Sequence, residues 1–539
     1  MEQFNEEEKK LIVPFFTNID KRIFCLINLP EVVKGALFSR YSRTAKSLRR
    51  VLLDEFINKP EMKFNEIVGQ VTAGTNQIIA TKKAEEFYDR VLVGYGDDSV
   101  AELGGANIAC EDVSQLAVKA LEDSRIGLSP LEKSTRYVRF DDKIDGQYRY
   151  YKDPDVMRSE FAELYVKTIE YLFDTYAKLI EPIMKFLMER IKKDETTTDR
   201  AYQSAIRAKA CDILRGLLPA ATSTNVGIFG NGRAFEYLIT KMLANPLAEI
   251  RDVAKSMHEE LSKVIPSFVK RSVDKYGQET QTYFTDTAST MQKIAQNATK
   301  TIEPEKSDYI TLVKYDPEAE NKVVAALLYP HSKFSMRQLI ELAGEMSVEE
   351  RKKIIREHFT HRKNRRHKPG RAFENVHYTF DILANFGIYR DLHRHRMLTQ
   401  ERQDLTTEFG YDIPREVIDA GFQKEFDDAM KKAAEAFKII SQKFPKQAQY
   451  LVPLASRLRW YFTMSLREVI YMIELRSIQQ GHPDYRKIVQ QMFRLVQHVH
   501  PTFAEGIKFV DMNEYSLERI ESEKRIDKRM EEIKEKYGS

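Results

Sequence analysis

One stretch of the chain occurs twice, and this internal repeat limits the possible folds more than any other feature. Residues 448–476 align without gaps on residues 214–242. Among the matched residues are Pro453 with Pro219, Arg467 with Arg233 and Tyr471 with Tyr237. Two copies are too few for a solenoid, because stacked repeats need several neighbours to bury a continuous core. The repeat therefore predicts a tandem duplication that folds as two sister domains packed together.

The elements around the two copies combine strand and helix patterns. Residues 309–315 alternate as a strand does, and residues 318–328 follow with a helical pattern. Long amphipathic helices are expected at residues 153–188 and 414–444. We expect a first domain at residues 12–290, a linker at 291–308 within the polar stretch 270–308, a second domain at 309–515, and a solvated, charged C-terminal helix at 516–539.

An Arg-His-Arg triplet stands at the end of an apolar run. Arg394, His395 and Arg396 follow residues 380–392, which read as a mostly buried segment. Buried guanidinium groups need anionic partners, since an unpaired interior charge costs several kcal/mol or more. The planar fork of arginine also fits phosphate. The triplet therefore indicates either a site for a phosphate-bearing ligand or a cluster that the protein's own carboxylates satisfy.

Two further arginines lie among apolar residues. If residues 461–476 form one helix, Arg476 lies on the same stripe as Phe462, Leu466 and Val469. There it either snorkels at the helix end or points into a pocket that holds an anion or a carbonyl. Arg215 precedes Leu217, Leu218 and Pro219, and either forms an ion pair at the edge of the core or binds a ligand.

The triplet and a second segment share one signature, RHRxxSxxExSxR. Arg394, His395 and Arg396 fit its first half, with Thr399 in the place of the first Ser. Residues 124–137 fit its other half, through Ser129, Glu132, Ser134, Arg136 and Tyr137. The chain thereby resembles the flavin-dependent thymidylate synthases over most of residues 12–515. The resemblance implies an α+β fold, here two tandem domains, each with a mixed β-sheet and long helices.

In that family each active site lies between subunits of a homotetramer, and the resemblance implies how this chain divides the roles. The second domain keeps the flavin-binding residues Arg394, His395 and Arg396, and the catalytic Arg476 that faces the nucleotide base. The first domain keeps the residues that bind the nucleotide, which are Glu132, Ser134, Thr135, Arg136 and Arg215. Ser99, Asn231 and Arg233 match positions that contact flavin.

The two halves lack complementary residues. Gln449 stands where the second domain would have its nucleotide-binding arginine, and Met242, or Lys241 if a gap is allowed, where the first would have its late arginine. Residues 96–99 and 369–372 lack a histidine that the family has in this turn, and Asp391 replaces its usual glutamine. We expect one working composite site per chain, at the interface between the two domains, and one inactive site.

The resemblance implies reductive methylation of dUMP to dTMP. The carbon comes from 5,10-methylenetetrahydrofolate, reduced FAD supplies the hydride, and NADPH regenerates the flavin. By analogy, a homodimer of tandem chains replaces four single-domain subunits. Alternatives are a related flavin enzyme acting on another pyrimidine nucleotide, and a catalytically silent protein that binds nucleotides or nucleic acid through the basic residues 351–371.

Composition narrows the remaining possibilities. The chain has 85 basic and 81 acidic residues and a net charge of +4, so only a local patch favours nucleic acid, which we consider an unlikely partner. Three cysteines without CxxC spacing, and histidines without cysteines or well-spaced carboxylates, predict neither a disulfide framework nor a metal site. No apolar run reaches the length of a membrane span or a signal peptide. We therefore expect a cytoplasmic protein.

Overall fold

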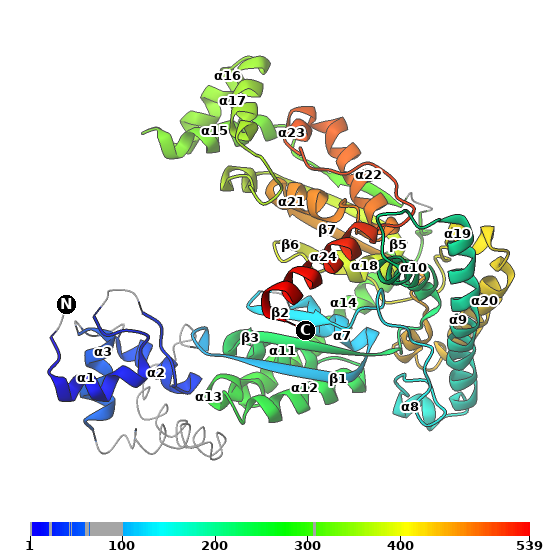
Figure 1. The fold of residues 1–539 in the computed structure, drawn as a ribbon, viewed down its shortest axis with the longest axis horizontal. Helices are drawn as coiled ribbons and strands as arrows, with labels where there is room; N and C mark the ends of the chain where they lie inside the picture. The colour runs from blue at the N-terminus through cyan, green and yellow to red at the C-terminus, as the bar shows by residue number, and fades with distance from the viewer. Residues whose placement is uncertain are drawn as a thin grey trace. The chain divides into compact units, whose positions relative to one another are not determined.

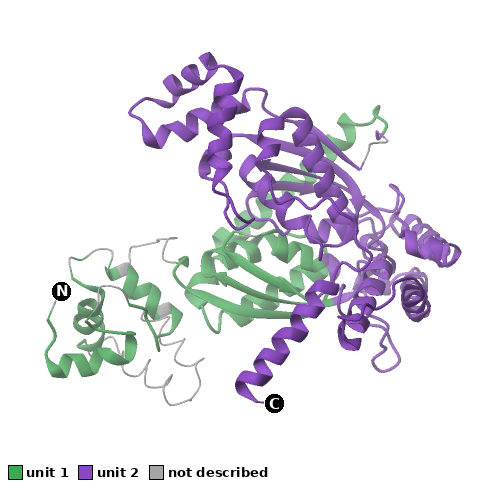
Figure 2. Cartoon of the chain, turned by 45° about the horizontal axis from the view of Figure 1, so that its top comes forward, with its two compact units in different colours: residues 1–113, 117–132, 224–303 green, residues 114–116, 133–223, 304–539 purple. Residues whose placement is uncertain are grey.

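The chain folds into two compact units (Figure 2). The computed structural model describes residues 3–20, 24–41, 44, 46–59, 64, 101–124, 126–305 and 309–538. Unit 1 comprises Met1–Val113, Ala117–Glu132 and Thr224–Glu303, and unit 2 comprises Ser114–Leu116, Lys133–Ser223 and Pro304–Ser539. Unit 2 therefore contains chain from both copies of the repeat. The domain boundaries drawn from the repeat stay a prediction, because these units follow tertiary contacts instead.

Unit 1 contains a three-stranded sheet in the order β1-β3-β2, in which β2 and β3 are antiparallel. Its helices near the N-terminus are α1 (Glu6–Ile12), η1 (Val13–Phe15), α2 (Glu31–Tyr41), α3 (Leu48–Val51) and η2 (Leu52–Ile57). The sheet and its neighbours are β1 (Gly105–Ser114), α7 (Gln115–Asp123), β2 (Leu128–Glu132), β3 (Ser223–Asn231), α11 (Gly232–Leu243), α12 (Ala248–Leu261), α13 (Pro266–Val269), η5 (Lys270–Ser272) and α14 (Lys275–Ala298). The expected linker thus begins inside α14.

Unit 2 contains a four-stranded sheet in the order β4-β5-β7-β6. Its first part holds α8 (Pro154–Met157), α9 (Ala162–Arg190), α10 (Asp199–Leu214) and η4 (Arg215–Leu217). Then follow β4 (Ile310–Lys314), α15 (Ala319–Leu328), η6 (Tyr329–His331), α16 (Met336–Glu345), α17 (Val348–Thr360), η7 (Arg371–Asn375), β5 (His377–Asn385), α18 (Phe386–Leu392) and β6 (Leu398–Arg402). The last elements are α19 (Arg415–Asp419), α20 (Gln423–Ile440), η8 (Gln447–Leu451), β7 (Arg457–Ser465), α21 (Leu466–Arg476), α22 (Pro483–Val499), α23 (Pro501–Glu505) and α24 (Ile520–Tyr537).

The sheet of unit 2 buries alternate side chains of its two central strands. β5 pairs antiparallel with β7, and this register sets Phe380 opposite Phe462 and Ile382 opposite Trp460. All four side chains are buried. Aromatic and β-branched residues that alternate with polar ones favour a strand, because successive side chains point to opposite faces. Long helices complete the unit, and Figure 1 shows α9 and α20 side by side.

The predicted duplication is confirmed in the order of the elements. The strands β5-β7-β6 of unit 2 repeat the order β1-β3-β2 of unit 1. β3 and β7 occupy equivalent positions of the repeat, and each leads directly into a helix, α11 or α21. The predicted strand at 309–315 and helix at 318–328 are also confirmed, as β4 and α15. The mixed α+β fold expected from the sequence is therefore present.

The predicted helix over residues 461–476 is wrong in its first part. β7 continues to Ser465, and Phe462 lies on this strand rather than on a helical stripe with Arg476. A short apolar run fits both a strand and a helix, and here the aromatic residues pair with β5. The helix α21 begins at Leu466, and the hydroxyl of Ser465 caps it by accepting a hydrogen bond from the backbone N–H of Glu468.

The long helix expected at residues 414–444 is divided into two. α19 ends at Asp419, and α20 begins at Gln423. Between them Gly421 has a φ of 83°, a left-handed conformation that commonly terminates helices. The helix expected at residues 153–188 corresponds to the short α8 and the long α9.

The C-terminal helix α24 is fixed by ion pairs at its start and is not simply solvated. Arg200 on α10 contacts Glu523 and Asp527, and the Glu523 side chain is buried. Lys524 pairs with Asp194 at 3.0 Å. In the described part of the chain, none of the helices combines the length and the apolar composition that a membrane span requires.

Candidate functional site

Two arginines from the first copy of the signature region form buried ion pairs in unit 2. Arg136 donates through Nε to Asp212 Oδ1 at 2.8 Å and through Nη2 to Asp212 Oδ2 at 2.7 Å. Arg215, at the end of α10, donates through Nη2 to Asp391 Oδ2 at 2.9 Å. Asp391 follows Arg390 in α18, so the pair of Arg215 and Asp391 joins the two halves of the chain. For Arg136 and Arg215, the protein's own carboxylates are the partners.

The two carboxylates stay ionised although they are buried. Burial alone would raise the pKa of Asp212, but the charges of Arg136 and Arg215 hold that pKa below its usual value. Burial acts in the same way on Asp391, and Arg215 and Arg136 lower the pKa of its carboxyl well below the usual range. Two acids and two arginines thus form one cluster in which both carboxyl groups are ionised at physiological pH.

A second set of contacts fixes Arg476 at the end of α21. Arg476 donates through Nε to His395 Nε2 at 3.0 Å, and His395 Nδ1 lies 2.6 Å from Glu468 Oε1. A guanidinium group can only donate, so His395 Nε2 is the acceptor and Nδ1 carries the proton that it gives to Glu468. The imidazole is buried. His395 is therefore held in one tautomer by Glu468 and orients Arg476.

Tyr485 lies between the two sets. Its ring centroid is 6.0 Å from Arg136 Cζ and 5.9 Å from Arg476 Cζ. A further contact between the halves comes from Arg390, whose Nη1 donates to Thr135 Oγ1 at 3.3 Å. Four predicted residues, Arg136, Arg215, His395 and Arg476, therefore lie in one connected cluster of unit 2. We call it the arginine cluster, defined by Arg136, Arg215, Asp212, Asp391, His395, Glu468, Arg476 and Tyr485.

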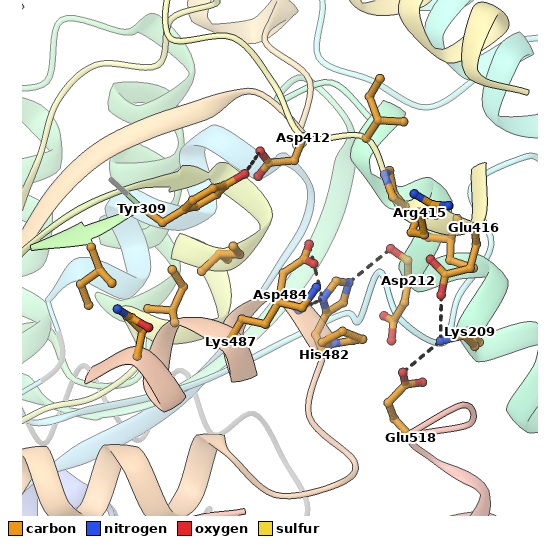
Figure 3. A pocket seen from close by; sticks show the side chains of 18 residues that line it. Lys209, Asp212, Tyr309, Asp412, Arg415, Glu416, His482, Asp484, Lys487 and Glu518 are labelled. Atoms are coloured by element: carbon orange, nitrogen blue, oxygen red, sulfur yellow. Dashed lines mark hydrogen bonds and ion pairs between the residues drawn. The ribbon is translucent and has the colours of Figure 1, made fainter. Parts of the chain in front are cut away.

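A cavity of about 650 Å³ borders the arginine cluster (Figure 3). Figure 3 shows His482 between Asp212 and Asp484 in its wall. A smaller space of about 60 Å³ shares these residues and reaches Arg215. The backbone N–H of Asp484 donates to His482 Nδ1 at 3.2 Å, so Nε2 carries the proton and faces the carbonyl oxygen of Asp212 at 3.3 Å. His482 is thus neutral and lines the cavity beside Asp212.

The remaining nucleotide-binding candidates take part in other contacts. Glu132, at the end of β2 in unit 1, accepts a hydrogen bond from the buried Lys119 at 3.2 Å. The Ser134 hydroxyl accepts a hydrogen bond from the backbone N–H of Arg136 at 3.2 Å, which shapes the loop that carries this arginine.

The two arginines of the Arg-His-Arg triplet differ in exposure: Arg394 is half-buried and Arg396 is exposed. Arg394 lies close enough to Asp391 to help lower the pKa of that carboxyl.

Of the three further flavin candidates, two lie in unit 1. Asn231 caps α11, and its Oδ1 accepts from the backbone N–H of Ala234 at 2.8 Å. Arg233 pairs with Glu102 at 2.8 Å and is half exposed. Ser99 lies outside the described residues. The roles assigned to these residues stay predictions.

Replacing Asn231 with alanine is expected to lower the free energy of unfolding by about 1 kcal/mol, because the cap of α11 is lost. Asn231→Ser is the matched control, since Ser465 caps α21 at the equivalent position of the repeat. Urea unfolding of both variants measures the effect. An unchanged stability of Asn231→Ala together with weaker flavin binding would mean that Asn231 serves a ligand instead.

The positions that lack their family arginines are filled by satisfied or apolar side chains. Gln449 accepts through Oε1 from the backbone N–H of Leu405 at 2.9 Å and donates through Nε2 to the carbonyl of Lys446 at 3.1 Å. Met242 is buried in unit 1. Both residues therefore serve the fold locally, and the inactivity of the second site stays a prediction.

Several residues of the arginine cluster and of the adjoining cavity were not predicted from the sequence. Asp212 lies one helical turn before Arg215, which is a usable signal for an acid at the same site. Glu468 is a charged residue at a buried position of α21, but its burial appears only in the folded chain. His482 lies in the loop after α21, and Tyr485 lies in the first turn of α22. Neither residue belongs to the repeated segment.

Two of the three cysteines, Cys110 and Cys211, are buried, whereas Cys25 is exposed. Burial raises the pKa of the Cys211 thiol to about 11, and it does the same for Cys110. A thiol with so high a pKa is a poor nucleophile at neutral pH. Within the described residues, no group of three or more His, Cys, Asp and Glu side chains is suited to hold a metal ion.

His482 should make the stability of the protein fall on mild acidification. Burial, followed by the charge of Arg215, lowers its pKa in the folded state, while Asp212 and Asp484 act in the opposite sense. The unfolded chain then takes up a proton near pH 6.5 that the folded chain does not, so stability is full above this pH and falls below it. The slope has an upper limit of about 1.4 kcal/mol per pH unit.

Urea unfolding of the wild type and of His482→Gln between pH 8 and pH 5 measures this effect. The variant should lose less stability than the wild type over this range, because glutamine cannot titrate. Other histidines add the same slope to both proteins, so the difference between the two curves isolates His482. Parallel curves would contradict the assignment.

Comparisons with known proteins give the following matches. The family model Thy1, described as thymidylate synthase complementing protein, matches residues 44–267 and 311–502. A UPF0159 protein of Chlamydia muridarum is 43% identical over 525 residues, which cover 97% of this chain and 98% of the relative. A flavin-dependent thymidylate synthase of Geobacter sulfurreducens is 30% identical over 144 residues, 24% of this chain and 61% of the relative. The crystal structure of a UMP/dUMP methylase, PolB from Streptomyces cacaoi bound with 5-Br dUMP, is 18% identical, with a TM-score of 0.29 and coverage of 37% of this chain and 95% of that chain.

Proposed function

Since this chain belongs to the Thy1 family of thymidylate synthase complementing proteins, we propose that it is a flavin-dependent thymidylate synthase with its site in the arginine cluster. The reaction is the reductive methylation of dUMP to dTMP, with methylenetetrahydrofolate as carbon donor and NADPH as reductant. The observation that supports this proposal best is the meeting, in one compact unit, of Arg136 and Arg215 with His395 and Arg476. The first pair comes from the first half of the chain and the second from the second half.

Arg136 and Arg215 are suited to hold the phosphate of the nucleotide. Their acidic partners orient the guanidinium groups and occupy Nε and Nη2 of Arg136 and Nη2 of Arg215. Among the described residues, no hydrogen-bond partner occupies Nη1 of either arginine, so this group remains for a phosphate oxygen. Each charge-assisted hydrogen bond contributes roughly 1.5–3 kcal/mol.

Arg476 is suited to stabilise negative charge on the pyrimidine as its C5 becomes nucleophilic. A donor that is already oriented before the reaction stabilises developing charge without the cost of reorganisation. The hydrogen bonds from Arg476 to His395 and from His395 to Glu468 provide this orientation. His395 therefore acts as a positioning residue for Arg476.

The residues near His395 fit a flavin dinucleotide. Arg394 and Arg396 provide guanidinium groups of the kind that hold phosphate, and the aromatic ring of Tyr471 lies 5.5 Å from the ring of His395. Arg394, Arg396 and Tyr471 would hold the cofactor. Bound flavin supplies the hydride of the reductive step, while the protein binds and orients the reactants and excludes water.

The test is dTMP formation by the purified protein from dUMP, methylenetetrahydrofolate, FAD and NADPH. The proposal predicts dTMP, with loss of the product when any one component is left out. Absence of dTMP under all of these conditions, with correctly folded protein, would refute it.

A second candidate is an enzyme of the same fold that acts on another pyrimidine nucleotide. It is favoured by Asp391, which pairs with Arg215 where the family usually has glutamine. A carboxylate beside a phosphate-binding arginine lowers the net positive charge of that site and so weakens its hold on a dianion. The same assay with other uridine and deoxycytidine nucleotides distinguishes the two candidates.

A further inference from the structure

Residues 361–368, here called the basic loop, are anchored to the same helix that carries Arg476. Arg362 donates through Nη1 to Glu474 Oε1 at 3.0 Å and through Nη2 to Glu474 Oε2 at 2.6 Å. The side chains are 5% and 1% exposed, so this ion pair is buried. Arg362 Nε also donates to the carbonyl of His367 at 2.6 Å, which ties the far end of the loop to the same anchor. Arg362 therefore serves the fold and is not available to a ligand.

The rest of the basic loop is closed by its own hydrogen bonds. Asn364 Oδ1 accepts from the backbone N–H of Arg366 at 2.9 Å, and the backbone N–H of Lys363 donates to His367 Nδ1 at 3.4 Å. The backbone N–H of Lys368 donates to the carbonyl of Arg366 at 3.0 Å. A loop fixed in this way loses little conformational freedom when it binds a ligand.

The loop carries a concentration of positive charge toward solvent. Lys363, Arg366 and Lys368 are exposed and Arg365 is half-buried. Within the described residues, none of these four cations forms an ion pair with a carboxylate. Neighbouring like charges on a fixed loop repel one another, and a multiply charged anion would relieve this repulsion.

The basic loop adjoins the arginine cluster through one aromatic ring. Lys368 Nζ lies 4.0 Å from the centroid of Tyr471, and the Tyr471 ring lies 5.5 Å from the ring of His395. Arg467, on the first turn of α21, donates to the carbonyl of Pro369 at 2.8 Å and fixes the end of the loop beside this ring. A ligand bound beside His395 could therefore extend over Tyr471 to the cations of the loop.

We propose that the basic loop binds the pyrophosphate of a dinucleotide cofactor whose other end lies at the arginine cluster. This inference rests on the proposed function, which supplies two such cofactors, FAD and NADPH. Arginine forks and lysine ammonium groups both match phosphate oxygens. A single phosphate would need fewer cations than the loop offers. Nucleic acid is the competing occupant, but on the preceding helix α17 Lys352 pairs with Glu349 and Arg356 with Glu505, so part of the basic segment before the loop is already neutralised.

The test compares ligand binding by the double variant Lys363→Gln/Arg366→Gln with binding by a control double variant, Lys431→Gln/Lys438→Gln. Both double variants remove two exposed cations, the first pair from the loop and the second from α20. Dissociation constants are measured by fluorescence for FAD, for riboflavin, which has no phosphate, for NADPH, and for a labelled single-stranded oligonucleotide. The loop variant should bind FAD or NADPH about tenfold more weakly or worse, with unchanged riboflavin binding and a smaller dependence on salt. The α20 variant should behave as the wild type.

The four ligands distinguish the possible outcomes. A loss confined to FAD or to NADPH supports the proposal and identifies the cofactor. An equal loss for riboflavin overturns it, because the variant then disturbs the site as a whole, and a loss confined to the oligonucleotide overturns it in favour of nucleic acid. If the wild type binds FAD and the loop variant binds it equally well, and NADPH likewise, only this inference fails. If the wild type binds neither cofactor, the proposed function fails with it.

Discussion

Replacing Arg476 with alanine is expected to lower the rate of dTMP formation by about 10²–10³-fold, the cost of removing one oriented donor from a site where charge develops. The loss should appear in kcat more than in KM, because the interaction strengthens in the transition state. Arg476 lies at the end of α21 and is half-buried, so the fold should tolerate the change. Arg476→Lys is the control that keeps the charge but loses Nε, which His395 binds.

Glu468 should affect the rate of dTMP formation through Arg476. Glu468→Ala removes the acceptor that fixes the tautomer of His395, so Arg476 loses its orientation and turnover falls. In the double variant Glu468→Ala/Arg476→Ala the loss should equal that of Arg476→Ala alone, because residues that act as a unit are not additive. Additive losses would contradict this, since Glu468 would then contribute to the reaction by another route.

Arg136→Ala is expected to lower the free energy of unfolding by about 3–5 kcal/mol. The substitution leaves Asp212 buried without its bidentate partner, and removing one member of a buried ion pair is more costly than removing both. Urea unfolding measures the loss. A stability within experimental error of the wild type would contradict the assignment of Arg136 and Asp212 as a buried pair.

The double variant Arg136→Leu/Asp212→Leu distinguishes the contribution of Arg136 to protein stability from its contribution to dUMP binding. It removes both charges, so much of the lost stability should return. Its affinity for dUMP, measured by calorimetry, should nevertheless stay well below that of the wild type, because Arg136 is the group that we expect to hold the phosphate. Wild-type affinity in this variant would exclude Arg136 from the nucleotide site.

The repeat was the most informative part of the sequence for the fold. It predicted the duplication, and the strands β3 and β7 lie at the matched positions. It could not predict whether residues 461–465 extend a helix or a strand, because the pairing of β7 with β5 decides this and lies outside the segment. It also could not show that residues 133–223 group with the second half of the chain.

The arginines of the candidate site were visible in the sequence, whereas their partners were not. Arg136 stands in a signature copy, and Arg215 and Arg476 lie in the two copies of the repeat. Asp212 is 76 residues from Arg136, and Glu468 is 73 residues from His395. No local pattern connects residues at such separations. The resemblance assigned His395 to the flavin, but both of its ring nitrogens contact protein groups in the folded chain.

The central claim is that flavin and nucleotide share one site to which both halves of the chain contribute. The most direct test is the visible absorption spectrum of the protein with FAD, recorded before and after addition of dUMP, for the wild type, Arg394→Ala and Arg136→Leu/Asp212→Leu. The account predicts flavin bands that dUMP perturbs in the wild type, loss of bound flavin in Arg394→Ala, and retained flavin without a dUMP response in the double variant. A wild type that holds no flavin when FAD is in excess, or flavin bands that dUMP leaves unchanged, would contradict it.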